Sequence, residues 1–186
     1  MASPADQISY QAGALHDLVA GVQADQWANP TPCAKWSVRD LVNHLVGGGT
    51  IFAASFRGES VEMESATPDM LGDDATSAWD GVIASFETAV SAPGAMDREV
   101  VLPFATLPAQ VALDIASFDL LVHAWDLARA TGQSFDPPDN VVTAGRQVAD
   151  TMVDGLRDGD TFTDAVDAPA GASLMDQLAA FCGRTV

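Results

Sequence analysis

Apolar residues recur at helical spacing in four long segments of the chain, and this repetition limits the possible folds more than any other feature. Steps of three and four residues run through about 5–24, 37–57, 73–91 and 108–131. Each segment has an apolar face that must be buried against another element. Four such helices joined by two long connectors predict an all-α, up-and-down four-helix bundle.

The remaining chain, about 133–186, predicts extra C-terminal helices. A fifth helix follows Asp139, and a short sixth helix begins near Ser173. At this length the chain is expected to form a single domain, 1–186, with a bundle core of about 5–132. We interpret 133–186 as a segment that packs on that bundle.

Helix boundaries are marked by capping residues. Ser37 with Asp40 has the pattern of a capping box, and Gly132 is a typical C-cap after the fourth helix. Pro108 suits the first turn of that helix. Just before it, the extended run 99–102 predicts a short surface strand.

The charge balance excludes some partners. The chain has 26 acidic and 8 basic residues, a formal net charge of -18, and Lys35 is its only lysine. A polyanion must be met by clustered Lys and Arg, so no nucleic acid is expected as a partner. The apolar runs are too short for a membrane-spanning helix and the start of the chain has no signal pattern, so we expect a cytoplasmic protein. Cys33 and Cys182 lack Cys-x-x-Cys spacing and are expected to be reduced and buried.

Functional side chains concentrate in the middle of the fourth helix. Asp119, His123 and Asp126 follow one another at spacings of four and three residues, so they share one side of the helix. That side borders an apolar stripe formed by Phe118, Val122 and Trp125. Carboxylate and imidazole groups at a core boundary need partners, and a divalent cation satisfies both. The alternative is that Asp and His bond to each other or face water.

His44 is the candidate that could join this group from another helix. It lies at the border of the buried face of segment 37–57, one turn before the glycines at 47–49. Those glycines leave room for a ligand or for a closely packed helix. If the second and fourth helices are neighbours, His44 meets Asp119 and His123 inside the bundle. His16 is interpreted as a surface or boundary residue.

Two further pairs of residues have open roles. Asp126 and Arg129 are spaced for an ion pair, although Asp126 could instead orient His123. Trp36 and Trp125 could line a substrate cavity, but large aromatic residues at helical spacing more often belong to the core.

Three stretches resemble a known family: Trp27-x-x-Pro-Thr-Pro-Cys-x-x-Trp36, the Ser-Val-Arg-Asp-Leu-Val-Asn-His run ending at His44, and Asp119-Leu-Leu-Val-His123-Ala-Trp-Asp-Leu-Ala-Arg. They are similar to actinobacterial metal-binding proteins of the DinB-like superfamily, related to the N-terminal domain of mycothiol-dependent maleylpyruvate isomerase. The resemblance implies a DinB-like bundle that binds a divalent metal ion through His44, Asp119 and His123. Zinc is the expected metal, with nickel or iron as alternatives, and mycothiol is the implied thiol cofactor.

The resemblance has two limits. The isomerase has Glu where this chain has Asp119, so a water could bridge the carboxylate to the metal. The isomerase also has a separate C-terminal domain that helps to form its active site, whereas 133–186 is short. Its isomerase activity is therefore not carried over to this chain.

Three functions remain open at this stage. The first is a thiol-dependent transferase or isomerase that joins a metal-bound small thiol to an electrophilic substrate. The second is a non-catalytic metal-binding or stress-associated scaffold, possible as a homodimer. The third is a metal-dependent hydrolase, for which Asp126 is the candidate general base.

Overall fold

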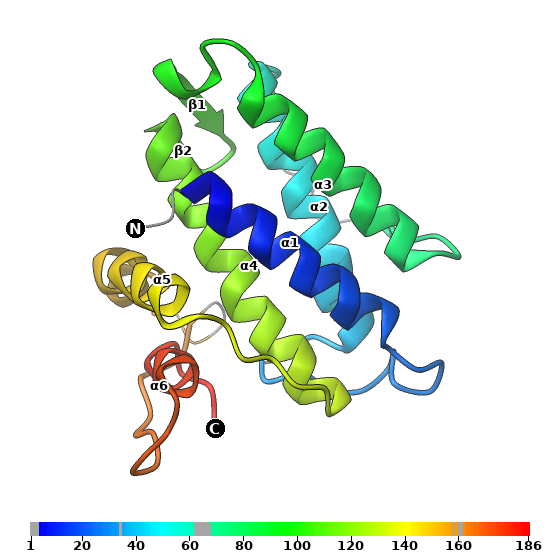
Figure 1. Cartoon of the computed structure of the whole chain (residues 1–186), viewed down its shortest axis with the longest axis vertical. Coiled ribbons are helices and arrows are strands. Elements are labelled where there is room, and N and C mark those ends of the chain that lie inside the picture. The colour runs from blue at the N-terminus through cyan, green and yellow to red at the C-terminus, as the bar shows by residue number, and fades with distance from the viewer. Residues whose placement is uncertain (1–3, 34, 62–67, 158, 160–161) are drawn as a thin grey trace.

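The structure is a computed structural model that describes residues 4–33, 35–61, 68–157, 159 and 162–186. It is mainly helical, which confirms the predicted all-α class (Figure 1). The helices are α1 (Pro4–Ala20), α2 (Val38–Arg57), α3 (Ala75–Ser91), α4 (Ala109–Thr131), α5 (Asp139–Met152) and α6 (Leu174–Phe181). Single 3-10 turns, η1 (Ala95–Asp97) and η2 (Val153–Leu156), follow α3 and α5.

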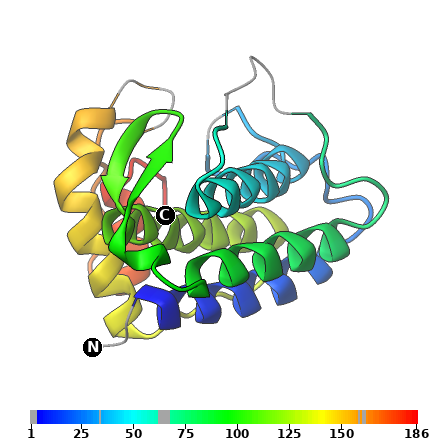
Figure 2. The ribbon, with the colours of Figure 1, turned by 90° about the horizontal axis from the view of Figure 1, so that it is seen from above.

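Helices α1 to α4 form the bundle, and α4 is shared with the C-terminal helices. Helix α4 contacts α1 and α2 on one side and α5 and α6 on the other, while α3 packs against α1 and α2 (Figures 1 and 2). Two apolar clusters result, one inside the bundle around Leu41 and Leu113, the other between α4, α5 and α6 around Leu121 and Leu178. A helix with neighbours on both sides is buried nearly all round, and α4 accordingly carries buried residues along its whole length.

Helix ends follow local chemistry. Ser37 and Asp40 form the capping box predicted for α2, and Ser173 caps α6 by accepting a hydrogen bond from the Asp176 N–H. Asp74 caps α3. Gly132 ends α4 with φ 69, a left-handed conformation that costs glycine little.

Two boundaries differ from the sequence expectation. The strand β1 (Glu99–Leu102) was predicted, but it pairs antiparallel with β2 (Ala105–Pro108), which was not. Helix α1 ends at Ala20 rather than near residue 24. The Gln133 side chain, which arrives from beyond α4, donates to the Leu18 carbonyl and closes that helix end. Within the described ranges, no helix is long and apolar enough to cross a membrane.

Candidate metal centre and its cavity

His44 on α2 meets Asp119 and His123 on α4. Oδ1 of Asp119 lies 3.5 Å from Nε2 of His44 and 3.4 Å from Nε2 of His123. One ligand-type atom from each of the three residues lies within 4.8 Å of the others. The structure therefore brings together the three residues that the sequence analysis selected, because α2 and α4 are neighbours in the bundle.

The spacing of these atoms fits a shared cation better than direct hydrogen bonds. A charged hydrogen bond between imidazole and carboxylate spans about 2.7–2.9 Å. Two ligand atoms held about 2.0–2.1 Å from one tetrahedral zinc ion lie about 3.3 Å apart. The observed 3.4 and 3.5 Å match the second value. Two imidazoles and one carboxylate are also a donor set that zinc, nickel and iron accept.

Asp126 orients His123 from the opposite side of the ring. Its Oδ2 lies 3.0 Å from Nδ1 of His123, and because an ionised carboxylate can only accept, Nδ1 carries the proton. Nε2 is then left to face Asp119. A carboxylate behind a ligating histidine is a recurrent feature of metal sites, since it fixes the ring and raises its basicity.

Arg184 completes this group from the end of the chain. Its Nη2 and Nε lie 3.1 and 3.3 Å from the two oxygens of Asp126, and its Nη1 donates to the Cys182 carbonyl. Asp126 and Arg184 are both buried. Arg129 pairs with Asp176. Of the two roles left open for Asp126, its contacts with His123 and Arg184 favour the orientation of His123 over an ion pair with Arg129.

Charges in this network shift the pKa values of its members. Burial alone would raise the pKa of Asp119, but the neighbouring His123 and His44 outweigh it and hold that pKa well below the usual range. Burial would lower the pKa of His123, but Asp119 and Asp126 outweigh it and raise the pKa to about 9. His123 is therefore protonated at neutral pH, and any metal ion has to displace that proton.

A cavity of about 430 Å³ opens beside the triad. Trp36 is one wall, with its ring centroid 4.5 Å from that of His44 and 5.5 Å from that of His123. Trp125 is a core residue whose indole N–H donates to Asp176. Of the two tryptophans, only Trp36 lines this cavity among the described residues.

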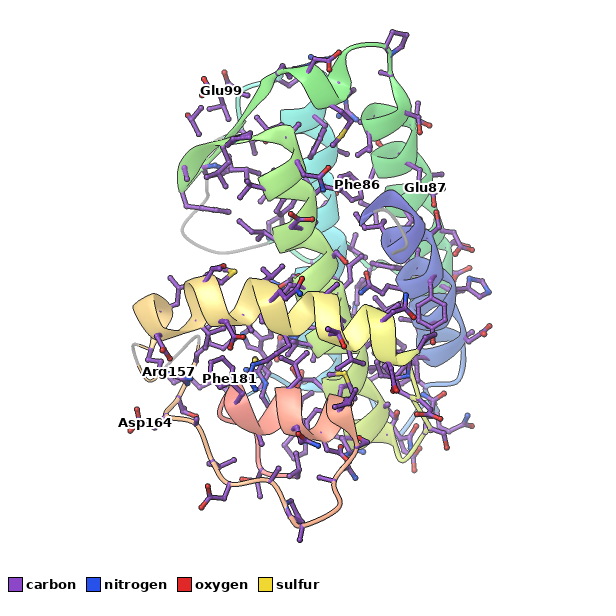
Figure 3. The ribbon with its side chains drawn as sticks, turned by 60° about the vertical axis from the view of Figure 1, so that its left-hand side comes forward. Phe86, Glu87, Glu99, Arg157, Asp164 and Phe181 are labelled. Carbon is purple, nitrogen blue, oxygen red and sulfur yellow. The ribbon has the colours of Figure 1, made fainter. Side chains whose placement is uncertain are left out.

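The C-terminal segment, 133–186, forms part of the cavity lining in addition to packing on the bundle. Met152, Leu156, Phe162 and Arg184 all line it. Figure 3 shows Arg157, which follows η2, beside Phe181 at the end of α6: the Arg157 guanidinium lies 5.0 Å from the Phe181 ring centroid and donates to the Phe181 carbonyl. Sequence reasoning missed these residues because they are distant in the chain and belong to no local motif.

Cys33 also lines the cavity. Its sulfur lies within 4.8 Å of ligand-type atoms of His123 and Asp126. Burial, reinforced by Asp126, raises the pKa of Cys33 to about 11. Cys182 is likewise free and buried, as expected. Cys33 therefore remains a protonated thiol at neutral pH and is a poor nucleophile.

Of the two uses that the sequence left open for the glycines after His44, close helix packing is seen at Gly49. A side chain at Gly49 would lie 3.0 Å from Val82 on α3, so this glycine permits close helix packing. A side chain at Gly48 would meet nothing within 4 Å. His16 is exposed, as expected, and pairs with Asp80 across the α1–α3 contact.

Known proteins share this class of helical bundle. Residues 9–128 match the mycothiol maleylpyruvate isomerase N-terminal domain family. Two uncharacterized proteins from two strains of Mycobacterium tuberculosis are each 37% identical over 180 residues, covering 91% of both chains. The protein belongs to the mycothiol maleylpyruvate isomerase N-terminal domain family, as the motifs predicted.

The crystal structure of a mutant of mycothiol-dependent maleylpyruvate isomerase has the same fold. It superposes with a TM-score of 0.61 and 15% sequence identity, over 77% of this chain and 70% of that chain. At this identity the comparison shows a shared helical fold alone.

Proposed function

We propose that the protein is a metal- and thiol-dependent transferase or isomerase, with His44, Asp119 and His123 as ligands of one divalent ion and mycothiol as the thiol. The observation that carries this proposal is the common distance of 3.4 to 3.5 Å from Asp119 Oδ1 to both Nε2 atoms. Because one oxygen faces both nitrogens, direct ligation by Asp119 is favoured over a water bridge. Membership of a family named after a mycothiol-dependent enzyme supports the choice of thiol.

The surrounding residues support this chemistry without a protein base. When bound, the metal supplies a positive charge that keeps a coordinated thiol ionised near neutral pH. Three protein ligands, His44, Asp119 and His123, would leave at least one coordination position of a bound ion unfilled. Asp126 and Arg184 fix the orientation of His123, and the Trp36 ring packs beside the two imidazoles. Mycothiol, when bound, would supply a sulfur nucleophile for an electrophilic carbon; a leaving group would depart in a transfer, and the thiol would be released again in an isomerisation.

The same contacts argue against the hydrolase alternative. A general base must be able to accept a proton from water in the cavity. Asp126, the one candidate, is fully buried, and its two oxygens are engaged by His123 and Arg184. It is a positioning residue in this proposal.

Calorimetric titration tests the metal and the thiol separately. Zinc is added to metal-free protein, and mycothiol is then added to the zinc-loaded protein. We expect one ion per chain and saturable thiol binding. His44→Ala and His123→Ala should each weaken zinc binding by at least about a hundredfold, because each substitution removes a side chain that binds the ion directly.

His16→Ala is the matched control, since His16 is the third histidine of the chain and lies away from the cavity. Full zinc occupancy in either ligand variant would refute the metal assignment. Zinc binding without any thiol binding in the millimolar range would leave the metal-binding scaffold as the better account.

A further inference from the structure

The cavity beside the metal centre has an apolar wall that the metal chemistry leaves unexplained. Phe118 and Phe162 stack there with ring centroids 6.2 Å apart, and Met152 and Leu156 extend the same wall. Phe162 comes from the segment after α5, beyond residues 9–128 that match the family. This wall is therefore a feature that the C-terminal segment adds to the family bundle.

The charged groups of the cavity are already engaged or lie at its edge. His44, Asp119 and His123 form the metal centre, and Asp126 together with the Cys182 carbonyl engages Arg184. Lys35 is exposed. Among the described residues that line the cavity, those other than the triad, Lys35, Trp36 and Arg184 have side chains of carbon and sulfur.

Size and shape agree with a small-molecule site. Pockets for drug-sized ligands measure about 300–1,000 Å³ and are lined mainly by apolar and aromatic side chains with a few polar groups. The cavity of about 430 Å³ falls within this range, and His44, Asp119 and His123 place polar groups in its otherwise largely apolar lining. A ligand with an apolar body and one reactive end would match this cavity, because the body would contact the apolar wall and the reactive end would lie at the triad.

We propose that the second substrate of the protein is an apolar electrophile, with an aromatic or branched aliphatic body that packs against the cavity wall formed by Phe118, Phe162, Met152 and Leu156. The electrophilic character of this substrate rests on the proposed function, because the thiol must have a carbon to attack. The binding of the apolar body depends on neither metal nor thiol. It follows from the transfer of apolar surface out of water into this wall.

The binding experiment uses the full chain without metal or thiol. The probe is 4-nitrobenzyl alcohol, an inert aromatic compound, and the protein carries 13C-methyl methionine. We expect saturable shifts of the Met152 methyl resonance, assigned with Met152→Leu. Met175 is an internal control, because it is buried between α4 and α6 and does not line this cavity.

Two exposed leucines give a matched pair of variants. Leu156 lines the cavity and is 41% exposed, whereas Leu174 on α6 is 43% exposed and lies outside it. A carboxylate beside the apolar body has to be desolvated, so Leu156→Asp should weaken probe binding by about tenfold or more. Leu174→Asp should leave the affinity unchanged.

Fumarate, a small dianion, is the competing ligand class. The proposal is overturned if fumarate shifts the Met152 methyl and the aromatic probe does not, if Met152 and Met175 respond equally, or if both leucine variants bind the probe alike. These results leave the zinc and mycothiol titrations untouched. Failure of the apolar substrate class is thus distinguishable from failure of the proposed function.

Discussion

At the scale of single residues, the centre depends on a chain of contacts from Arg184 through Asp126 to His123. Asp126 is fully buried, and its oxygens contact one imidazole and one guanidinium. A buried charge is tolerated when it is paired, but the partner that remains after one charge is removed becomes strongly destabilising. The network therefore links the stability of the protein to the geometry of the candidate metal centre.

Asp126→Asn should damage both properties. The uncharged amide leaves Arg184 buried without its counter-ion, so we expect the free energy of unfolding to fall by about 3–5 kcal/mol. Loss of the carboxylate behind His123 should weaken zinc binding by about 10–100-fold. Urea denaturation and chelator competition measure the two effects. Asp176→Asn is the control, since Asp176 pairs with Arg129 away from the triad; equal zinc affinity in both variants would contradict the role assigned to Asp126.

Metal binding should also depend on pH in a defined direction. With the pKa of His123 raised to about 9, the ring is protonated at neutral pH, and only the neutral ring binds metal. Apparent zinc affinity should rise by about tenfold per pH unit from about 7 to 9 and then level off. Asp119 stays ionised throughout, because its pKa is held low. Calorimetry in two buffers of different ionisation enthalpy should detect about one proton released per ion at pH 7, and a constant affinity over this range would contradict the prediction.

Among the helices, α2 contacts two neighbours, α3 and α4, near its run of three glycines. It packs closely on α3 at Gly49 and presents His44 to α4 one turn earlier. A glycine inside a helix costs roughly 1 kcal/mol relative to alanine, so close packing has to offset that cost. Gly48 has open space around its Cα and lacks this compensation.

Gly48→Ala should therefore stabilise the protein by about 0.5–1 kcal/mol, through helix propensity alone. Gly49→Ala should be less favourable, because its methyl group would lie 3.0 Å from Val82 and the valine would have to move. Urea denaturation of the adjacent pair is the test. A Gly49→Ala protein at least as stable as Gly48→Ala would show that α2 and α3 are more loosely packed than the structure indicates.

At the scale of the whole molecule, acidic charge dominates. The formal net charge is -18, and several of the 8 basic residues are already held in exposed pairs such as Arg39–Asp69 and Arg146–Asp150. Exposed pairs contribute only about 0–1 kcal/mol each. Repulsion among the remaining carboxylates is therefore a significant cost of the folded state.

Salt should raise the thermal stability for this reason. Increasing sodium chloride from about 0.01 M to about 1 M shortens the screening length from about 30 Å to about 3 Å. We expect Tm to rise by several degrees at pH 7, measured by circular dichroism. Near the pI of about 4.1 the net charge vanishes, so the same addition should have a smaller effect. Equal salt responses at the two pH values would contradict the repulsion argument.

Much of the bundle and the triad could be predicted because both depend on local spacing. Apolar periodicity located the helices, Ser37 and Ser173 located two helix starts, and the four-residue step from Asp119 to His123 placed both on one side of α4. His44 followed from its position at the edge of a buried face. The second strand of the hairpin was missed because its four residues have no strong alternation, and they pair only in the presence of β1.

The amino-acid sequence alone was enough to locate the helices and the first strand, the caps at Ser37, Gly132 and Ser173, the acidic charge and the side of α4 that carries the candidate ligands. Only the tertiary structure decided which charges pair. Arg129 is one helical turn from Asp126, yet Asp126 pairs with Arg184, which is 58 residues away. Arg129 forms an ion pair with Asp176. The physical reason is burial: the Asp126 side chain is 0% exposed and needs a buried cation, whereas Arg129 is 48% exposed and remains partly hydrated. Spacing along α4 shows that Asp126 and Arg129 can reach each other. The packing of residues 133–186 on α4 determines that Asp126 and Arg184 are the two charges buried together.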